Sequence, residues 1–477
     1  MLQAQPLTEQ ARNYPGLKLE SIENTVLSTI INRKVEDELQ KEALPLPSLD
    51  RRLVLEDFQA ALTYGSGRHF ILECKQSSPS LGDFCRDFNL DRLLDCYNRH
   101  AAAISVLCEE HFFKGSLEYL TYVKERSQVP VLCKDFIICK RQLEEAFTAG
   151  ADAVLLMLSV LKPERFIELF EHCRDLGLAA LCEVDTEEDA RLAHALKLPV
   201  CGVNNRDLRV LKIDLNRSLR LAPLLSHRCS IVAESGISTH ADLLALKPLK
   251  NFLIGSSLSG SEDVFFKANS MLYGLNKICG IKTKEGLRAA IKAHAAIAGL
   301  IFVKKSPRCV SLKQAEELIA QGRPYIRFAG VFQNEDLAEV VKLATQLELE
   351  YLQLHGQEDE AYLDELKARL PKVQLIKALA VKNQEDLGEV ERYLDHCDLL
   401  LLDSASPGSG RTFDWNALPD TLPRGRMLLS GGIGPDNVER ALQLNFAGLD
   451  LNSRLEREKG IKDPELIEQT FAIINSF

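Results

Sequence analysis

Sixteen short apolar segments, each about as long as one β-strand, divide the chain into two sets of eight. Helical patterns such as those at 140–150 and 336–348 separate consecutive segments within each set. Runs of β-branched and aliphatic residues between helices are typical of strands buried on both faces of a parallel sheet. The first set lies at 69–75, 102–108, 129–136, 152–158, 179–184, 199–207, 229–235 and 251–257, and the second at 276–281, 298–305, 325–334, 351–356, 375–381, 399–404, 426–432 and 447–453.

Two complete eightfold sets predict an α/β protein made of two tandem (β/α)₈ (TIM) barrels, packed with little or no linker. We expect the first barrel at 49–273 and the second at 274–477, because the helical pattern at 262–274 runs almost directly into the next strand. Residues 1–48 are expected to be an N-terminal extension of the first barrel unit, with an amphipathic helix at 19–43. Doubly wound open sheets fit less well, since no GxGxxG motif follows a first strand.

The composition is that of an ordinary globular protein, with 46% hydrophobic and 26% charged residues among 477. The formal net charge of −10 argues against a nucleic-acid or membrane surface, because such partners are usually met by a basic field. No apolar run is long enough to cross a bilayer, and the N-terminus does not resemble a signal peptide. Thirteen cysteines without a CxxC pair indicate reduced thiols and argue against a zinc site. We therefore expect a cytoplasmic protein.

Polar and charged side chains stand at the predicted strand ends of the first half, where a parallel barrel builds its site. Two lysines beside several carboxylates in one mouth would suit general acid/base chemistry on an anionic substrate. Each residue alone could instead be a solvated strand end or a structural ion pair. The candidates are Glu73, Lys75, Lys134, Glu183, Asn204, Arg206, Glu234, Ser235 and Ser256.

The second half carries a different set at its predicted strand ends, namely Cys279, Arg308, His355 and Asp403. A thiol and a carboxyl facing each other across a barrel mouth could take one proton from carbon and give another to oxygen. A buried small hydrophobe is the alternative for Cys279, and a structural strand-end histidine is the favoured interpretation of His355. Asp403 follows four leucines, where a charge is costly without a partner or a function.

A glycine-containing motif occurs twice, as VAESGIS at 232–238 and LLSGGIG at 428–434. In each half another short strand follows and ends in small polar residues, at 251–257 and 447–453. Glycines and small residues after strands seven and eight of a barrel expose backbone N–H groups that can bind a phosphate without net basic charge. One such segment could be only a tight turn, but its recurrence at the same strands predicts a phosphate site in each half.

At these residues the sequence resembles two known enzyme families. The first half is similar to indole-3-glycerol-phosphate synthase in ECKQSSPS, FFKGSLEYL, CKDFI, GVNNRDL, AESGI and IGSSL. The second half is similar to phosphoribosylanthranilate isomerase in KICGI, SPR, LHG, GSGRTFDW and SGGI. Their order and fusion match the bifunctional tryptophan-biosynthesis enzymes of some bacteria. Only residues 1 to about 20 extend beyond the family's usual start.

For the second half, the resemblance implies an Amadori rearrangement of N-(5-phosphoribosyl)anthranilate, with Asp403 as general acid on the ring oxygen and Cys279 as general base at C2. It implies that Arg308 holds the anthranilate carboxylate and that His355 lies in the substrate site. The phosphate would be bound by Gly408, Gly410, Gly432, Asn452 and Ser453.

For the first half, the resemblance implies conversion of the isomerase product to indole-3-glycerol phosphate. Lys134 would act as general acid during ring closure, and Glu183 with Lys75 would transfer protons in the dehydration. The remaining implied contacts are Glu73, Asn204, Ser235 and Glu234 for the sugar hydroxyls, Arg206, Gly236, Gly255 and Ser256 for the phosphate, Phe113 and Phe136 for the aromatic ring, and Ser78 as a further substrate-binding residue.

The resemblance implies no metal and no cofactor. The expected partners are small phosphosugar-anthranilate substrates, with no nucleic acid and no membrane, and we expect a monomer. Two alternatives stay open from the sequence: one barrel could be catalytically inactive, or the protein could be a non-catalytic phosphosugar-binding sensor. A sensor would need the glycines but not Lys134, Glu183, Cys279 and Asp403 together.

Overall fold

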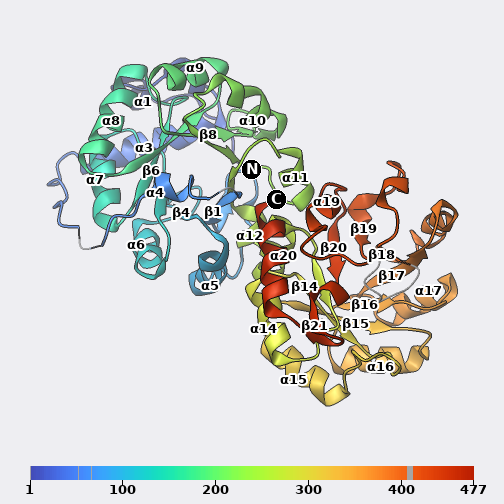
Figure 1. Ribbon diagram of the computed structural model, residues 1–477. Helices are drawn as coiled ribbons and strands as arrows, with labels where there is room; N and C mark the ends of the chain where they lie inside the picture. Colours follow the sequence, from blue (N-terminus) through green and yellow to red (C-terminus); the bar gives the residue numbers. More distant parts are fainter. Residues whose placement is uncertain (1, 52, 66, 405–411) are drawn as a thin grey trace. The chain divides into compact units, whose positions relative to one another are not determined.

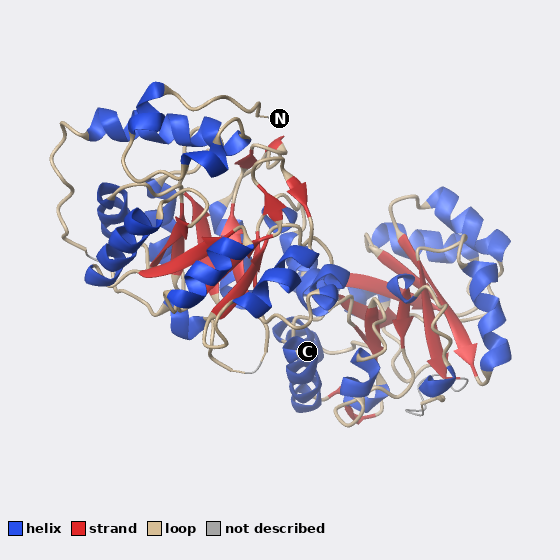
Figure 2. Ribbon diagram, turned by 90° about the horizontal axis from the view of Figure 1, so that it is seen from above, coloured by secondary structure: helices blue, strands red, loops and turns tan. Residues whose placement is uncertain are grey.

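The computed structural model describes residues 2–51, 53–65, 67–404 and 412–477 (Figure 1). The chain separates into two compact units, Met1–Ser238 with Ala245–Val264 and Thr239–Leu244 with Phe265–Phe477. Each unit contains one closed barrel of eight parallel strands, which confirms the predicted fold class. Figure 2 shows the strands of each unit surrounded by helices.

In the first barrel the strands pair in the order β1-β12-β11-β8-β7-β6-β5-β4, and β4 closes the ring on β1. The strands are β1 (His69–Cys74), β4 (Ala103–Leu107), β5 (Val131–Lys134), β6 (Ala153–Met157), β7 (Ala179–Val184), β8 (Val200–Asn204), β11 (Ser230–Glu234) and β12 (Asn251–Ile254). The helices after them are α5 (Leu90–His100), α6 (Leu117–Arg126), α7 (Lys140–Ala149), α8 (Pro163–Asp175), α9 (Glu187–Ala195), α10 (Asn216–Leu221), α11 (His240–Ala245), α12 (Ser256–Ser259) and α13 (Val264–Tyr273).

The second barrel pairs its strands in chain order from β13 to β20, and β20 closes on β13. Its strands are β13 (Lys277–Cys279), β14 (Ile297–Ile301), β15 (Arg327–Phe332), β16 (Tyr351–Leu354), β17 (Gln374–Val381), β18 (Leu399–Ser404), β19 (Met427–Leu429) and β20 (Gly448–Leu451). Its helices are α14 (Lys284–Lys292), α15 (Leu312–Gly322), α16 (Leu337–Gln346), α17 (Glu360–Arg369), α18 (Glu389–Tyr393), α19 (Val438–Leu442) and α20 (Pro464–Ser476).

Each of these sixteen strands overlaps one of the predicted segments. Strands such as β4, β6 and β14 are buried at every residue, because the barrel interior covers one face and the helices cover the other. Apolar side chains fill the interior of the second barrel rather than leaving a pore. They include Ile297, Ala329, Tyr351, Ile376, Leu401 and Leu428.

The predicted single helix at 19–43 is wrong in one respect, because the structure breaks it into α2 (Leu19–Ile22) and α3 (Val26–Lys41). Asn24 has a φ of 56°, which a continuous helix cannot contain. Thr25 then caps α3, since its side chain accepts the N–H of Ser28 and the Ser28 hydroxyl returns a contact to the Thr25 backbone. The chain before α3 contains the short α1 (Glu9–Asn13), and α4 (Phe58–Ala61) precedes the first barrel strand.

Three two-stranded ribbons decorate the barrels: β2 (Ser77–Ser78) with β3 (Gly82–Asp83), β9 (Arg206–Asp207) with β10 (Lys212–Ile213), and β21 (Glu456–Glu458) with β22 (Ile461–Lys462). They follow β1, β8 and β20 respectively.

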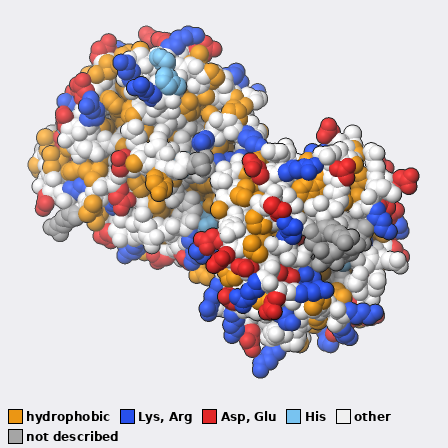
Figure 3. Space-filling view, viewed as in Figure 1, with side chains coloured by type: hydrophobic (Ala, Val, Ile, Leu, Met, Phe, Trp, Pro, Cys, Tyr) orange, Lys and Arg blue, Asp and Glu red, His pale blue; other side chains and the backbone are white. Residues whose placement is uncertain are grey.

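Acidic and basic side chains are interspersed on the face drawn in Figure 3. Among the described residues, no helix has the length and hydrophobicity needed to cross a bilayer.

Closure of the second barrel leaves no room for a side chain at Gly448. A Cβ atom there would lie 2.1 Å from the backbone oxygen of Leu275. We expect Gly448→Ala to lower the free energy of unfolding of the second unit by roughly 1–3 kcal/mol, the usual cost of overpacking. Urea unfolding followed by the fluorescence of Trp415, the chain's single tryptophan, measures this unit.

Gly388→Ala is the matched control. Gly388 is exposed, has helical backbone angles (φ −61°, ψ −25°), and has no atom within 4 Å of the position its Cβ would take. Alanine should therefore be neutral or stabilising by up to about 1 kcal/mol. Equal midpoints for the two variants would contradict the close approach at Gly448.

Candidate active sites

A cavity of about 450 Å³ opens at the carboxyl end of the first barrel. It lies where the predicted site residues come together from different strands. Its lining includes Glu73, Lys75, Ser78, Phe113, Lys134, Phe136, Glu183, Asn204, Arg206, Ser235, Gly236, Gly255 and Ser256. Of the first-half candidates, only Glu234 is absent from this lining; its side chain is fully buried and contacts Lys134.

Lys134 lies at the centre of a charged cluster. Its Nζ is 2.8 Å from Oε2 of Glu234 and 3.6 Å from Oε2 of Glu73, while Lys75 Nζ approaches Oε1 of Glu73 at 3.0 Å. Burial alone would lower the pKa of Lys134, but Glu234, Glu73 and Glu183 outweigh it and hold that pKa above its ordinary value. The cluster therefore presents a fixed, protonated amine to the cavity.

The two carboxyl groups that face the cavity differ in protonation. Burial and the charge of Glu234 raise the pKa of Glu183 to about 8, against the opposing effect of Lys134. Burial would also raise the pKa of Glu73, but Lys75 and Lys134 outweigh it and lower that pKa. Near neutral pH, Glu183 thus carries a proton that it can donate, while Glu73 is ionised.

An aromatic wall covers another part of this cavity. The rings of Phe113 and Phe136 lie 6.1 Å apart between centroids, with an interplanar angle of 37°, and Lys75 Nζ lies 5.6 Å from the centre of the Phe113 ring. Val26 and Ile30 of α3 add apolar lining. An aromatic ligand with an acidic substituent would match this combination of apolar wall and lysine.

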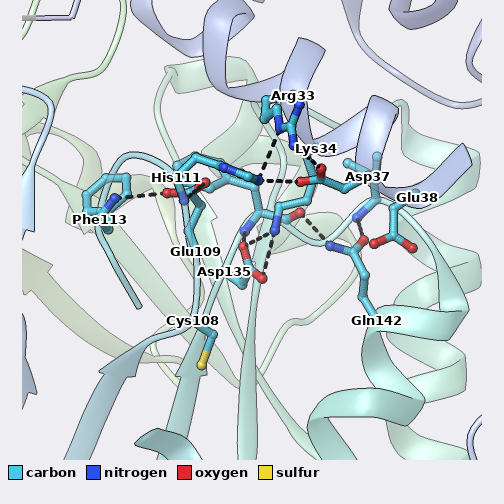
Figure 4. Close-up of polar contacts among 12 residues, drawn as sticks. Arg33, Lys34, Asp37, Glu38, Cys108, Glu109, His111, Phe113, Asp135 and Gln142 are labelled. Atoms are coloured by element: carbon cyan, nitrogen blue, oxygen red, sulfur yellow. Dashed lines mark hydrogen bonds and ion pairs between the residues drawn. The ribbon is translucent and has the colours of Figure 1, made fainter. Parts of the chain in front are cut away.

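Helix α3 is tied to the loops that carry both aromatic rings (Figure 4). Lys34 Nζ lies 2.8 Å from Oδ1 of Asp135, and that carboxylate accepts the N–H of Phe136 at 2.7 Å. On the neighbouring loop, His111 Nε2 lies 2.9 Å from Oδ2 of Asp37 in α3, and Glu109 Oε2 accepts the N–H of Phe113 at 2.9 Å. These contacts make α3 part of the cavity wall, although the chain places it far before the barrel.

Small residues after β11 and β12 form an open cradle at one end of the cavity. Gly236 has a φ of +84°, and a Cβ there would lie 2.5 Å from Cγ2 of Ile213, so glycine is required. A Cβ on Gly255 would lie 2.5 Å from Oε1 of Glu73. Ser256 begins α12, and Arg206 lies nearby on the cavity wall. Exposed backbone N–H groups beside an arginine are suited to an anion.

The second barrel has its own cavity of about 300 Å³ at the same end of the strands. The predicted residues Cys279, Arg308, His355, Asp403, Gly432, Asn452 and Ser453 line it. Gly408 and Gly410 lie outside the described residues. As in the first barrel, the glycines follow the seventh strand, and Gly431 and Gly432 have φ values of 92° and 65°.

Asp403 and Cys279 are both buried at this cavity. Burial and the charge of Asp450 raise the pKa of Asp403 to about 6, against hydrogen bonds from the Ser404 N–H and the Ser430 side chain. Burial also raises the pKa of Cys279, and Lys277 opposes that increase. Burial lowers the pKa of His355 to about 4, so its ring is neutral at physiological pH.

Arg308 is held rigidly by a carboxylate that sequence reasoning did not identify. Its Nε and Nη2 lie 2.7 and 2.9 Å from the two carboxylate oxygens of Glu456. Lys462 Nζ also contacts Glu456 Oε1 at 2.9 Å and Asn452 Oδ1 at 2.8 Å. Two cations around one buried carboxylate leave net positive charge at this side of the cavity.

The sequence analysis also missed the buried pair Lys277 and Asp450, whose Nζ and Oδ1 lie 2.9 Å apart. Asp450 lines the cavity, and Lys277 lies two residues before Cys279 on the same strand. A signal was present, because both charges interrupt apolar strand segments, as Asp403 does. In the first half the missed lining residues include Val26, Ile30 and Asp135.

Comparison with known proteins assigns both halves. The family model of indole-3-glycerol phosphate synthase matches residues 27–271, and that of N-(5'-phosphoribosyl)anthranilate isomerase matches residues 276–472. Tryptophan biosynthesis protein TrpCF of Salmonella typhi is 41% identical over 458 residues, covering 95% of this chain and 100% of that protein. The Vibrio cholerae protein of the same name is 40% identical, covering 95% and 96%. Phosphoribosyl anthranilate isomerase of Thermus thermophilus, a crystal structure, has 30% identity and a TM-score of 0.38, covering 41% of this chain and 96% of that one.

The Lys34–Asp135 contact predicts that α3 can be loosened selectively. Lys34→Met would leave the largely buried carboxylate of Asp135 without its cation, at a cost of roughly 1–3 kcal/mol. We expect faster amide hydrogen exchange across 26–41 than in the unaltered protein. Lys41→Met, on the same helix but at a more exposed pair, is the control. Unchanged exchange in the Lys34 variant would show that this contact does not hold α3.

Proposed function

Because the chain belongs to the family of fused tryptophan-biosynthesis enzymes that join indole-3-glycerol-phosphate synthase to phosphoribosylanthranilate isomerase, we propose that each barrel catalyses one of the two reactions at its own cavity. We assign the synthase to residues 1–273 and the isomerase to residues 274–477. The isomerase converts N-(5-phosphoribosyl)anthranilate to 1-(2-carboxyphenylamino)-1-deoxyribulose 5-phosphate. The synthase cyclises, decarboxylates and dehydrates that product to indole-3-glycerol phosphate.

The observation that carries this proposal is that each cavity combines an acid/base set with a glycine-rich anion cradle. The first has Lys134, Glu73 and Glu183; the second has Cys279 and Asp403. A sensor for phosphorylated sugars would need only the cradles. Buried groups with pKa values moved toward neutrality add catalytic capacity that binding does not require.

In the isomerase, we assign Asp403 to protonate the ribose ring oxygen, which opens the ring to an iminium. Cys279 then removes the proton from C2, and the electron pair of that C–H bond forms the C1=C2 bond of an enolamine. Arg308, fixed by Glu456 through Nε and Nη2, would offer Nη1 to the anthranilate carboxylate. His355 is neutral and is assigned to substrate contact rather than to proton transfer.

In the synthase, Lys134 would donate to the ketone oxygen as the anthranilate ring carbon attacks, and loss of carbon dioxide follows. Glu183 would then protonate the departing hydroxyl, which its raised pKa supports, and Lys75 would assist that proton transfer. Glu73, Asn204, Ser235 and Glu234 are assigned to orienting the sugar, Glu234 acting through Lys134. Phe113 and Phe136 would stack against the anthranilate ring.

The phosphate of both intermediates is assigned to the small residues after the seventh and eighth strands. In the first barrel these are Gly236, Gly255 and Ser256, with Arg206 and Ser78 at the same cavity. In the second they are Gly432, Asn452 and Ser453. We assign Gly408 and Gly410 to the same phosphate from the family resemblance alone.

We further propose that the chain acts as a monomer in the cytoplasm, on small molecules and without nucleic acid. Each cavity is lined by residues of its own unit, which supports a single chain as the active species. The net charge of −10 supports the exclusion of nucleic acid. Sedimentation equilibrium at enzyme-assay concentration tests the oligomeric state.

Two single substitutions should separate the activities. Lys134→Ala is expected to lower indole-3-glycerol phosphate formation about 10²–10⁴-fold, the usual contribution of a general acid, and to leave isomerisation unchanged. Cys279→Ala should have the converse effect. Each variant is assayed with phosphoribosylanthranilate and separately with the isomerised intermediate. Normal indole-3-glycerol phosphate synthesis by the lysine variant would refute the role of Lys134, and loss of both reactions would point to misfolding.

The isomerase should show a plateau in its pH dependence. The reaction needs Asp403 protonated and Cys279 ionised. Below pH 6, Asp403 is protonated and the thiolate fraction grows about tenfold per pH unit. Above pH 6, loss of the acid offsets further gain of thiolate, so kcat/KM should level off. A steady fall of kcat/KM through pH 6, measured in buffers of constant ionic strength, would contradict the assigned pair.

A further inference from the structure

We infer that Lys277, anchored by Asp450 in a niche that Gly299 leaves open, is the counter-ion that allows Cys279 to act as a base. This inference rests on the function proposed for the second barrel. It makes Lys277 a positioning residue, since it acts through the thiol and is not assigned a contact with substrate.

The strand geometry places the amine beside the thiol. Lys277 and Cys279 are two residues apart on β13 and therefore point to the same side of the strand. That side is the barrel interior, because Lys277 is completely buried and Cys279 lines the cavity. Burial raises the pKa of the Cys279 thiol, and the positive charge of the Lys277 amine opposes that increase.

The neighbouring strands prepare a space for this amine. On β14, Gly299 is the in-register partner of Cys279. A Cβ on Gly299 would lie 3.0 Å from each of Lys277 Nζ, Lys277 Cε and the Cα of Cys279. On β20, Asp450 is the in-register partner of Lys277, and the two side chains form the 2.9 Å ion pair. The amine is therefore fixed from both sides of β13.

The surrounding charges favour a protonated amine. Burial would lower the pKa of Lys277, but Asp450 and Cys279 outweigh it and raise that pKa. A permanent cation beside a buried thiol stabilises the thiolate. Without it, burial and Asp450 would both disfavour ionisation of Cys279.

Other charged groups lie on the elements around the thiol. Lys462 of β22 also favours the thiolate, but its Nζ donates hydrogen bonds to Asn452 and Glu456. Arg308 is paired with Glu456, Asp403 lies on β18, and His355 after β16 is neutral. Among these cations only Lys277 shares a strand with Cys279, and it lowers the pKa of the thiol more than Lys462 does.

The proton transfer itself is conventional. Cys279 as thiolate takes the C2 proton, the electron pair of the C–H bond becomes the C1=C2 bond, and the iminium nitrogen loses its positive charge. Lys277 keeps its own proton throughout. Lys277 increases the fraction of enzyme molecules in which Cys279 is ionised before substrate binds. Replacing Lys277 should therefore lower kcat with little change in KM.

The test measures the ionisation of the Cys279 thiol in the full-length protein. Iodoacetamide alkylation is followed across pH by mass spectrometry of the Cys279 peptide, with Cys309 in the same digest as the reagent reference. Lys277→Met should move the alkylation midpoint to higher pH and slow alkylation at pH 8 about tenfold or more, since one pKa unit changes the thiolate fraction about tenfold.

Lys377→Met is the matched control, because Lys377 forms another buried ion pair in this barrel, 2.8 Å from Glu358, and has no contact with Cys279 among those described. Its alkylation midpoint should stay unchanged. Gly299→Ala keeps every charge but fills the niche, and it should shift the midpoint in the same direction as Lys277→Met. Trp415 fluorescence verifies that each variant is folded.

An unchanged midpoint in folded Lys277→Met overturns the inference, and if that variant does not fold, Gly299→Ala decides in the same way. Failure of the proposed function would look different. Cys279→Ala would then still isomerise phosphoribosylanthranilate, whatever Lys277 does to the thiol.

Discussion

Parallel closure of each eight-stranded sheet is the constraint on which both sites depend. It directs the carboxyl ends of all strands to one rim, so that side chains from distant parts of the sequence meet there. Side chains such as Glu73, Arg308 and Asp403 are buried at that rim, and a buried charge needs a partner. Lys134 therefore lies between Glu234 and Glu73, and Arg308 is clamped by Glu456.

The two rims satisfy this requirement differently. In the first barrel the amines and carboxylates face the cavity, where burial and the charge of Glu234 keep Glu183 protonated, while Lys75 and Lys134 keep Glu73 ionised. In the second barrel, buried ion pairs lie around the reacting groups, and the cavity lining includes the thiol of Cys279, the carboxyl groups of Asp403 and Asp450, and a neutral histidine. The same architecture thus supports lysine-centred chemistry in one half and thiol–carboxyl chemistry in the other.

Local patterns were enough to predict the sixteen strands, the two closed barrels and several of the charged side chains that line each cavity. A residue such as Glu183 or Asp403 is recognisable because it ends a buried strand. The sequence alone did not reveal which side chains pair where the last strand of the barrel closes on the first. Lys277 and Asp450 are 173 positions apart and meet only because β20 pairs with β13. The complete burial of Glu234 against Lys134, 100 positions away in the sequence, depends in the same way on contacts that appear only after folding.

Buried ion pairs are a costly way to stabilise a barrel, since well-packed apolar residues are often as good or better. The second barrel nevertheless contains Lys277–Asp450 and Lys377–Glu358, and their positions suggest what each contributes. Lys377 Nζ also donates to the carbonyl of Gly356 at 2.8 Å, and Glu358 accepts the Gly356 N–H at 2.9 Å. This pair therefore fixes the turn directly after His355, while the other fixes an amine beside Cys279. Both place their charge where a side chain of the cavity must be held in one orientation, which apolar packing alone would not ensure.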